Sequence, residues 1–455
     1  MTGQTLSILM FIMTFCLLLF GFPVAFTLAG ISILFAFSAS LLDLLSSNYL
    51  ALIPSKIFGT MTNELLVAVP LFIFMGIFLE KSKIAEEVLE TIADLFGNVR
   101  GGLGFSVIIV GTLLAASTGI VGATVVTMGL LTLPTMLKWG YDKKLASGLI
   151  CASGTLGQII PPSIVLILLS DVLQGAYSQA QLLKGQIPTN PISTVDLFAG
   201  ALIPGLILVF FYCLWQLILI FVKPETCPPI LRKNKKKNSN PIIIIMLPIF
   251  LIIAVLGSIL AGIATPTEAA SVGSSGAILL SYIKKRFSIN NLKEAMIETM
   301  SISSMIFLIL IGAKLFSLVF IGLEGRETIS TFFETIPGES FGKMFFLMIL
   351  LFLLGFFLDF IQIIFIIIPI IGPIILQLNI DPLWFGIMIA VNLQTSFLTP
   401  PFGFALFYYR GIAPQIVKTL DIYKGVIPFV IIQIIVLLLI AKFPELALWL
   451  PNKLY

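Results

Sequence analysis

The stretch Gly154-Thr155-Leu156-Gly157-Gln158-Ile159-Ile160-Pro161-Pro162-Ser163 interrupts an otherwise apolar segment of the chain. It lies between the apolar runs 145–153 and 164–169, each too short to cross a bilayer alone, because a crossing needs about 20 residues. Its glycines and prolines release backbone amides and carbonyls that a continuous helix would bond. In hydrocarbon such groups persist only where protein buries them or where they line a wet cavity. The stretch therefore predicts a helix that is broken within the membrane.

A second stretch of the same kind lies near the other end of the chain. It reads Asn392-Leu393-Gln394-Thr395-Ser396-Phe397-Leu398-Thr399-Pro400-Pro401-Phe402-Gly403. Ion-coupled transporters bind their cargo at paired breaks, because half-helix ends and unwound carbonyls supply polarity without full charges. We therefore predict broken helices at 154–163 and 394–403, and we expect the transport site to lie at these two breaks.

The composition is that of a membrane protein. Of 455 residues, 58% are hydrophobic and 11% are charged, whereas soluble domains average about 25% charged residues. We therefore predict an all-α polytopic membrane protein without a soluble domain. The apolar N-terminus carries no basic residue before Lys56, so we interpret it as a retained first helix that enters from outside rather than as a signal peptide.

Several chemistries are disfavoured by what the sequence lacks. It contains no histidine, which removes the usual proton relay and most metal chemistry. The four cysteines show no metal or redox spacing, and no glycine-rich loop ends in the lysine and hydroxyl residue of an ATP-binding motif. We expect no enzyme activity, no cofactor and no transition metal, so an ion gradient is the expected energy source.

The chain divides into two similar halves. We predict a first repeat at 1–222, a basic cytoplasmic linker at 223–240 and a second repeat at 241–455. Pro23 and Pro266, Ser117 and Asp359, and Pro161 and Pro400 stand at nearly equal spacings. An internal repeat of this length is typical of transporters. Nucleic-acid binding by the linker is disfavoured, because the linker lies between two membrane spans.

Each half has a similar expected order of elements. In the first half we expect two helices within 4–40, a crossing at 65–79, a surface helix at 80–100, the segment 101–137, the broken crossing, a polar loop at 173–195 and a span at 196–222. In the second half we expect helices at 241–260 and 265–283, a surface helix after Lys284, a separate crossing at 300–322, the segment 344–378, the second broken crossing at 383–409 and a span at 425–443.

The segments 101–137 and 344–378 are expected to be re-entrant hairpins. For the first, the small and hydroxyl residues at 115–124 also fit a straight helix with a tight packing face. With both hairpins and an outside N-terminus, most Lys and Arg residues fall on the cytoplasmic side, as the positive-inside rule requires. The first half then makes an odd number of crossings, so the second half is inverted.

The breaks carry candidate sodium ligands, because unwound backbone beside Ser and Thr supplies oxygen atoms without a strong base. The alternative is that these hydroxyls only bond the backbone of their own helix. The candidates are Ser117, Gly119, Gly154, Thr155 and Gly157 in the first half, and Asp359, Gln394, Thr395, Ser396 and Thr399 in the second.

Three charged residues lie in apolar surroundings, where charges are costly and often functional. We interpret Asp359 as a cation ligand or a proton carrier. Glu268 is either functional or a first-turn acid that caps the helix beginning near Pro266. Lys314 either attracts an anionic substrate or forms a structural ion pair or reaches an interface.

Three motifs together resemble the large membrane subunit of the tripartite ATP-independent periplasmic (TRAP) transporters, across essentially the whole chain. They are Ala152 through Ser163, Gly262 through Ala270, and Thr399-Pro400-Pro401-Phe402-Gly403. The resemblance implies a sodium-coupled importer with an inverted-repeat, elevator-type fold, in which a fixed scaffold supports a core of two hairpins and two broken helices. It also implies two partners, a small four-helix membrane subunit and a periplasmic substrate-binding protein, and a location in the bacterial inner membrane.

The family places sodium ions between each hairpin tip and its neighbouring broken helix. By resemblance, these positions are Ser117 and Gly119 with Thr155 and Pro161, and Asp359 and Phe360 with Thr399 and Pro401. We expect the substrate to contact Thr118, Gly157, Gln158, Gln394, Thr395 and Ser396.

The sequence departs from the family pattern at the tip 115–124, which lacks a Ser-Gly-Ser-like motif, and at Thr395-Ser396, where many members have a glycine. These departures resemble the branch that carries small organic or keto acids. The sequence therefore predicts sodium-coupled import of a small organic anion. The alternative is a stand-alone symporter or anion exchanger of similar fold; a membrane-embedded enzyme and a channel are disfavoured.

Overall fold

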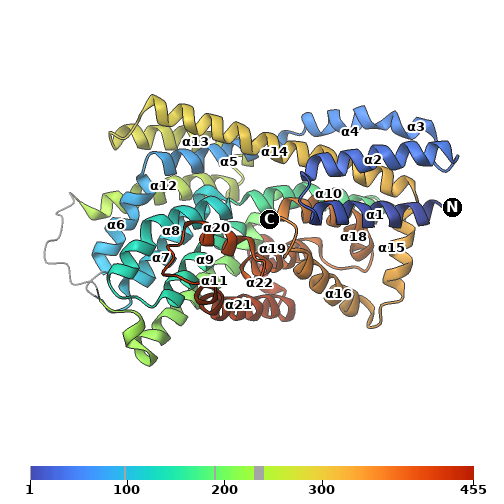
Figure 1. The fold of residues 1–455 in the computed structure, drawn as a ribbon. Coiled ribbons are helices and arrows are strands. Elements are labelled where there is room, and N and C mark those ends of the chain that lie inside the picture. Colours follow the sequence, from blue (N-terminus) through green and yellow to red (C-terminus); the bar gives the residue numbers. More distant parts are fainter. Residues whose placement is uncertain (1, 97–98, 189–190, 230–239, 455) are drawn as a thin grey trace. The chain divides into compact units, whose positions relative to one another are not determined.

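The computed structural model of the chain describes residues 2–96, 99–188, 191–229 and 240–454 (Figure 1). The side chains of residues 47–48 and 117–118 also lie outside this description, as does most of the basic linker, residues 230–239. All regular elements in the described residues are helices. The predicted all-α class is therefore confirmed.

The elements up to residue 229 begin with a helix pair and end with the longest helix of this half. They are α1 (Gly3–Leu19), α2 (Val24–Leu41), α3 (Ser47–Leu50), α4 (Leu52–Met61), η1 (Glu64–Val67), α5 (Ala68–Lys81), α6 (Ile84–Phe96), α7 (Gly102–Thr118), α8 (Val121–Lys138), α9 (Lys143–Thr155), η2 (Leu156–Gln158), α10 (Ile164–Leu183), α11 (Thr194–Val222) and η3 (Pro224–Thr226).

The elements from residue 240 onward also begin with a helix pair. They are α12 (Pro241–Leu260), α13 (Pro266–Ile283), α14 (Ile289–Gly322), α15 (Gly325–Glu334), α16 (Glu339–Leu354), α17 (Phe360–Gln362), the π-helical η4 (Ile363–Ile367), α18 (Ile368–Leu376), α19 (Pro382–Leu398), α20 (Phe404–Ile412), α21 (Thr419–Lys442) and α22 (Glu445–Leu454).

Both predicted helix pairs separate where glycine and proline stand. Gly21 has a φ of +83° and Gly262 a φ of +67°, a backbone conformation that glycine adopts at little cost. Pro23 then precedes α2, and Pro266 begins α13. Proline is tolerated there because the first turn of a helix needs no donor from its amide.

The segment 101–137 folds as two helices rather than as one. α7 and α8 pack side by side and meet at Gly119, whose φ of +62° ends α7 in the left-handed region. The structure therefore favours a hairpin over a straight helix for this segment. That the hairpin is re-entrant in a membrane stays a prediction.

The predicted surface helix and crossing after Lys284 are not separate. The chain turns at Lys285, which has a φ of 56°, and then runs as one 34-residue helix, α14. The prediction of two elements was wrong, because a change from polar to apolar composition does not end a helix. A proline or a glycine cap is a common signal for the end of a helix, and α14 contains no proline.

Two further boundaries differ from the sequence prediction. The polar loop expected at 173–195 was wrong in its first half, because α10 continues to Leu183 and stops only before Gly185, whose φ is +70°. Gln, Ala and Leu in this stretch favour helix despite its polarity. The final span begins at Thr419 rather than at 425, and α22 follows it without having been predicted.

Six helices among the described residues are long and apolar enough to cross a membrane, and up to eight if two bent pairs each count as one span. One bent pair, α15 and α16, turns by 118° and is visible among the orange helices of Figure 1. The chain is therefore a multi-pass membrane protein.

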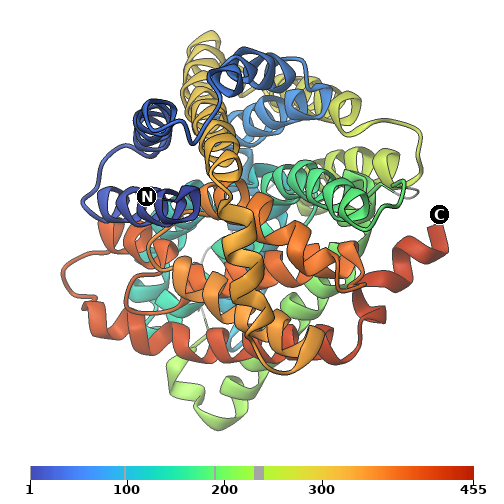
Figure 2. The same cartoon turned by 90° about the vertical axis from the view of Figure 1, so that its right-hand side faces the viewer.

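The chain forms two compact units, and each draws on both halves of the sequence. The first unit contains Met1–Leu66, Leu168–Ser193 and Met300–Phe385; the second contains Val67–Ile167, Thr194–Thr299 and Gly386–Tyr455. In the first unit, α1 packs against α2 and α15, as the view from the N-terminal side shows (Figure 2). The two predicted repeats stay a prediction.

In the second unit, the backbones of α9 and α21 approach each other closely. A Cβ on Gly148 would lie 2.1 Å from the carbonyl oxygen of Gly425, and a Cβ on Gly425 would lie 2.0 Å from that of Lys144. Small residues allow such contact between helices in a membrane. Beside it, the rings of Tyr212 and Phe429 meet edge to face at 5.1 Å, so α11 is fixed to α21 as well.

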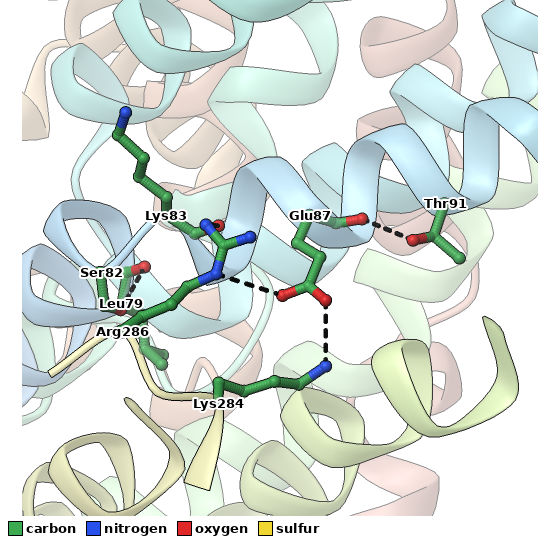
Figure 3. A network of polar contacts seen from close by, with 7 residues as sticks. All are labelled: Leu79, Ser82, Lys83, Glu87, Thr91, Lys284 and Arg286. Carbon is green, nitrogen blue, oxygen red and sulfur yellow. Dashed lines mark hydrogen bonds and ion pairs between the residues drawn. The ribbon is translucent and has the colours of Figure 1, made fainter. Parts of the chain in front are cut away.

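The largely buried carboxylate of Glu87 links α6, the predicted surface helix, to the residues that end and follow α13 (Figure 3). Glu87 pairs with Lys284 Nζ at 3.2 Å and with Arg286 Nε at 3.5 Å. Its backbone carbonyl accepts a hydrogen bond from Thr91 Oγ1 at 2.7 Å, one turn further along the helix. Two cations on one carboxylate make this contact stronger than an isolated surface pair.

We expect that Gly148→Ala and Gly425→Ala each destabilise the second unit, because the added methyl group has no space at the α9–α21 crossing. Overpacking costs about 1–3 kcal/mol, so the midpoint of thermal unfolding in detergent should fall by several degrees. Gly257→Ala in α12 is the matched control, since nothing lies within 4 Å of its Cβ position. Equal melting temperatures for all three variants would contradict the crossing.

Candidate functional site

The first break lies where α9 ends. α9 stops at Thr155, the short helix η2 follows, and α10 begins at Ile164. The Ile160 amide donates to the Leu156 carbonyl at 2.9 Å, and Ser163 Oγ donates to the Gln158 carbonyl at 2.8 Å. The peptide between Pro161 and Pro162 is cis. All residues of the break are buried, so the broken backbone is enclosed by protein, as the sequence argument requires.

The tip of the first hairpin packs on this break. A Cβ on Gly119 would lie 3.3 Å from the backbone nitrogen of Ile164, and a Cβ on Gly157 would lie 3.5 Å from the Ala115 carbonyl oxygen. Near the end of α9, a Cβ on Gly154 would lie 2.4 Å from Cγ2 of Val125 in α8. The structure thus brings these three predicted glycines to the hairpin tip and the break. A Cβ at Gly154 would clash with Val125 and one at Gly119 would crowd Ile164, whereas a Cβ at Gly157 would make only ordinary van der Waals contact.

Thr155 is held by residues that sequence reasoning did not single out. Its Oγ1 donates to the Ala152 carbonyl at 2.9 Å, and Gln433 Nε2 approaches Thr155 Oγ1 at 3.5 Å. The same Gln433 nitrogen donates to the Tyr212 hydroxyl at 2.7 Å. The signal that could have found Gln433 is a buried amide within the apolar run of α21.

Gln158 and Gln394 share an unusual feature. Each side chain is fully buried, and neither its amide nitrogen nor its amide oxygen has a hydrogen-bond partner among the described residues. A buried polar group without a partner costs about 1–3 kcal/mol. Such groups require an explanation, and a bound water or ion and a functional role are among those known. Gln158 lies in η2 within the first break, and Gln394 lies in α19, four residues before that helix ends at the second break.

The second break separates α19 from α20. The Gly403 amide donates to the Thr399 carbonyl at 3.0 Å, and Tyr423 OH donates to the Pro401 carbonyl at 3.0 Å. The Pro400–Pro401 peptide is cis, like its counterpart. After the break, α20 packs against α8 and α9, and Tyr409 OH lies 3.0 Å from Ser147 Oγ. α8 therefore contacts helices of both breaks.

The hydroxyls at the breaks bond the backbone of their own helices. Thr395 Oγ1 donates to Val391, Ser396 Oγ to Leu393, and Thr399 Oγ1 to Thr395, each at 2.7–2.8 Å. This arrangement is the one expected if the hydroxyls serve only to bond the backbone of their own helix. It uses the hydroxyl proton and leaves oxygen lone pairs for a cation, so it does not remove these atoms as ligands.

Asp359 and Phe360 lie at the turn between α16 and α17. Asp359 caps α17, and its Oδ1 accepts from the Phe360 amide at 2.8 Å. These two residues belong to the first unit, whereas Thr399 and Pro401 belong to the second. The proposed grouping of the four therefore stays a prediction. The predicted residues Ser117 and Thr118 end α7, and their side chains lie outside the described part of the structure.

Of the two roles considered for Glu268, binding and helix capping, the structure favours capping. It forms a capping box at the start of α13: the Thr265 amide donates to Glu268 Oε2 at 2.8 Å, and the Glu268 amide donates to Thr265 Oγ1 at 3.3 Å. The carboxylate is exposed. This favours a cap that satisfies the helix terminus over a role in binding.

The breaks offer neutral oxygen atoms and amides. Residues 153–163 and 394–403 contain no charged side chain, and the described residues hold no cluster of His, Cys, Asp or Glu that could bind a metal ion. Hydroxyls and free carbonyls suit a hard cation such as sodium, whereas a transition metal prefers imidazole or thiolate. The unpaired amides of Gln158 and Gln394 could donate to a carboxylate.

Comparisons with known proteins agree on one family. Residues 11–446 match the family described as "Tripartite ATP-independent periplasmic transporter, DctM component". The C4-dicarboxylate TRAP transporter large permease protein of Rhodobacter capsulatus is 30% identical over 96% of this chain and 99% of its own. The sialic acid TRAP transporter large permease protein of Vibrio cholerae is 28% identical over 96% of each chain.

A solved structure shares the fold. The YdaH transporter of Alcanivorax borkumensis, whose crystal structure was described as having an unusual topology, superposes with a TM-score of 0.66 over 90% of each chain at 13% identity. With the match over almost the whole sequence, this chain belongs to the DctM component family of the tripartite ATP-independent periplasmic transporters, and it is a transporter permease subunit rather than an enzyme.

Proposed function

We propose that the chain is the large permease subunit of a sodium-coupled transporter that imports a small organic anion. The observation that carries the proposal is the pair of buried amides, Gln158 in the first break and Gln394 in the helix that leads to the second, both without a partner in the described residues. Unpaired amide donors in buried, uncharged surroundings suit a carboxylate. Relatives are named for C4-dicarboxylates, sialic acid and ectoine, so the acid itself is left open.

Sodium is the proposed coupling ion. The chain has no histidine for a proton relay, and the breaks provide hydroxyl and carbonyl oxygens beside unwound backbone. We propose that one ion binds Ser117, Gly119, Gly154, Thr155 and Pro161, and that a second binds Asp359, Phe360, Thr399 and Pro401. The ions would fix the hairpin tips against the breaks, and thereby couple the sodium gradient to closure over the substrate.

The proposed assembly includes a small four-helix membrane subunit and a periplasmic binding protein, in the bacterial inner membrane. Family membership supports this, since the family is tripartite by its description. Within this assembly we propose an elevator motion, in which the hairpins and broken helices carry the substrate past a fixed scaffold. A stand-alone sodium symporter of similar fold is the second candidate, and it differs in needing no binding protein.

Uptake into proteoliposomes tests the proposed function. The chain and its small partner would be assayed with labelled succinate, pyruvate and sialic acid, with and without the binding protein and with and without an inward sodium gradient. We expect uptake of an organic acid only when both are present. Uptake with sodium alone would favour the stand-alone symporter, and uptake with neither would contradict sodium coupling.

Variants of the proposed sodium ligands should lose coupling without losing the fold. Asp359→Ala, and Thr155→Ala combined with Ser117→Ala, should reduce sodium-dependent uptake at least about tenfold, which corresponds to about 1.4 kcal/mol of lost ion binding. Thr155→Ser is the matched control, because it retains the hydroxyl. Normal sodium dependence in correctly assembled Ala variants would refute the site assignment.

Leucine in place of each unpaired amide should separate stability from transport. We expect Gln158→Leu and Gln394→Leu to raise the free energy of unfolding by about 1–3 kcal/mol, since each removes a buried group without a partner. The same variants should lose uptake. Gln433→Leu is the control, because it removes the hydrogen bond to Tyr212 and should lower the stability. A loss of stability in the first two variants would show that their amides are already satisfied.

A further inference from the structure

The first unit contains a polar cleft that the breaks do not form. Its volume is about 630 Å³, within the range of about 300–1,000 Å³ that holds small-molecule ligands. All of its lining residues belong to the first unit. They come from α3, α4, α10, α14, η4 and α18, and those that matter chemically are Tyr49, Lys56, Asp171, Gln179, Lys314 and Ser317.

The charges in the cleft are not balanced. Lys56 and Lys314 face one carboxylate, Asp171, which interacts with Lys314 through space. Asp171 Oδ1 also accepts a hydrogen bond from Asn63 Nδ2 at 2.7 Å. Part of the carboxylate is therefore occupied by a neutral donor, and the cleft retains a net positive charge.

Lys314 is a costly residue at its position. It is half-buried in α14, within a helix apolar enough to span a membrane, where a charged side chain is costly and usually has a function. Three residues further along α14, the hydroxyl of Ser317 is buried and has no hydrogen-bond partner in the described part of the chain. An ammonium and a free hydroxyl on successive turns of one helix form a donor pair for an anion.

We propose that this cleft is a second binding site for the carboxylate of a small organic anion, with Lys314 and Ser317 as its donors and Lys56 at its exposed rim. The identity of the anion as the transported one rests on the proposed function. The predicted orientation has the N-terminus outside, which places Lys56 on the periplasmic side, where substrate arrives. Tyr49 and Gln179 can hydrogen-bond a hydroxyl or keto group of the same molecule.

Direct binding to the purified complex of the chain and its small partner tests this proposal. Equilibrium binding of labelled succinate, pyruvate and sialic acid would be measured in detergent for the native complex and for Lys314→Gln, Asp171→Asn and Lys184→Gln. We expect Lys314→Gln to weaken binding of at least one acid about tenfold, and Asp171→Asn to strengthen it several-fold, since removal of an anion raises the positive potential. The asparagine can still accept from Asn63.

Lys184→Gln is the matched control. Lys184 belongs to the same unit but donates to Asn379 at 2.8 Å outside the cleft, so its loss should leave binding unchanged. Native affinity in Lys314→Gln would overturn the proposal, as would the absence of binding of all three acids. A structural ion pair predicts that both charge variants melt earlier and that the double variant recovers, with no opposite shifts in affinity.

Two further arms separate the remaining explanations. If Lys314 instead holds a lipid headgroup, its variant should change the retention of phosphatidylglycerol in nanodiscs and leave acid binding unaltered; that result would overturn the proposal. Failure of sodium-driven uptake, with Lys314-dependent binding intact, would count against the proposed function alone. Normal uptake, with binding indifferent to Lys314, would count against the cleft alone.

Discussion

Unpaired backbone groups cannot face hydrocarbon, and this requirement shapes the environment of the first break. The chain interrupts its helices between Thr155 and Ile164 and between Leu398 and Phe404, and the first break is wholly buried. The hairpin tip that ends on Gly119 fits against it, because a side chain at Gly119 would crowd Ile164. The first break is thereby enclosed by protein, whereas Pro401 and Phe402 of the second break are exposed.

This enclosure explains why the first break is polar but uncharged. A full charge in such a place would need a partner or a large stabilising contact, whereas an amide or a hydroxyl costs less to bury. Gln158 and Gln394 have no partner in the described residues, and a buried polar group without a partner is costly. In the function that we propose, a bound carboxylate would supply the missing hydrogen bonds.

Local patterns in the sequence predicted the elements and both breaks well. Gly21 with Pro23, and Gly262 with Pro266, mark helix ends by backbone chemistry that acts within a few residues. The same reasoning failed for α14 and α10, because polarity was taken as a boundary although no residue there ends a helix. Contacts over long distances in sequence, such as Gln433 with Thr155 and Tyr212, depend on packing that a single sequence does not reveal. For the same reason the cleft around Lys314 could not be recognised before the fold was known.

The contact between Gly148 and Gly425 has a mechanical consequence. The backbones of α9 and α21 touch there without intervening side chains, and the ring of Phe429 locks Tyr212 of α11 beside them. Sliding one helix along the other would drive Cα atoms into carbonyl oxygens, since packed interfaces shift between discrete arrangements rather than deform continuously. α9, which ends at the first break, is therefore packed in one block with α21 and α11. In the elevator motion that we propose, these three helices would move together, and a substrate bound at the break would move with them.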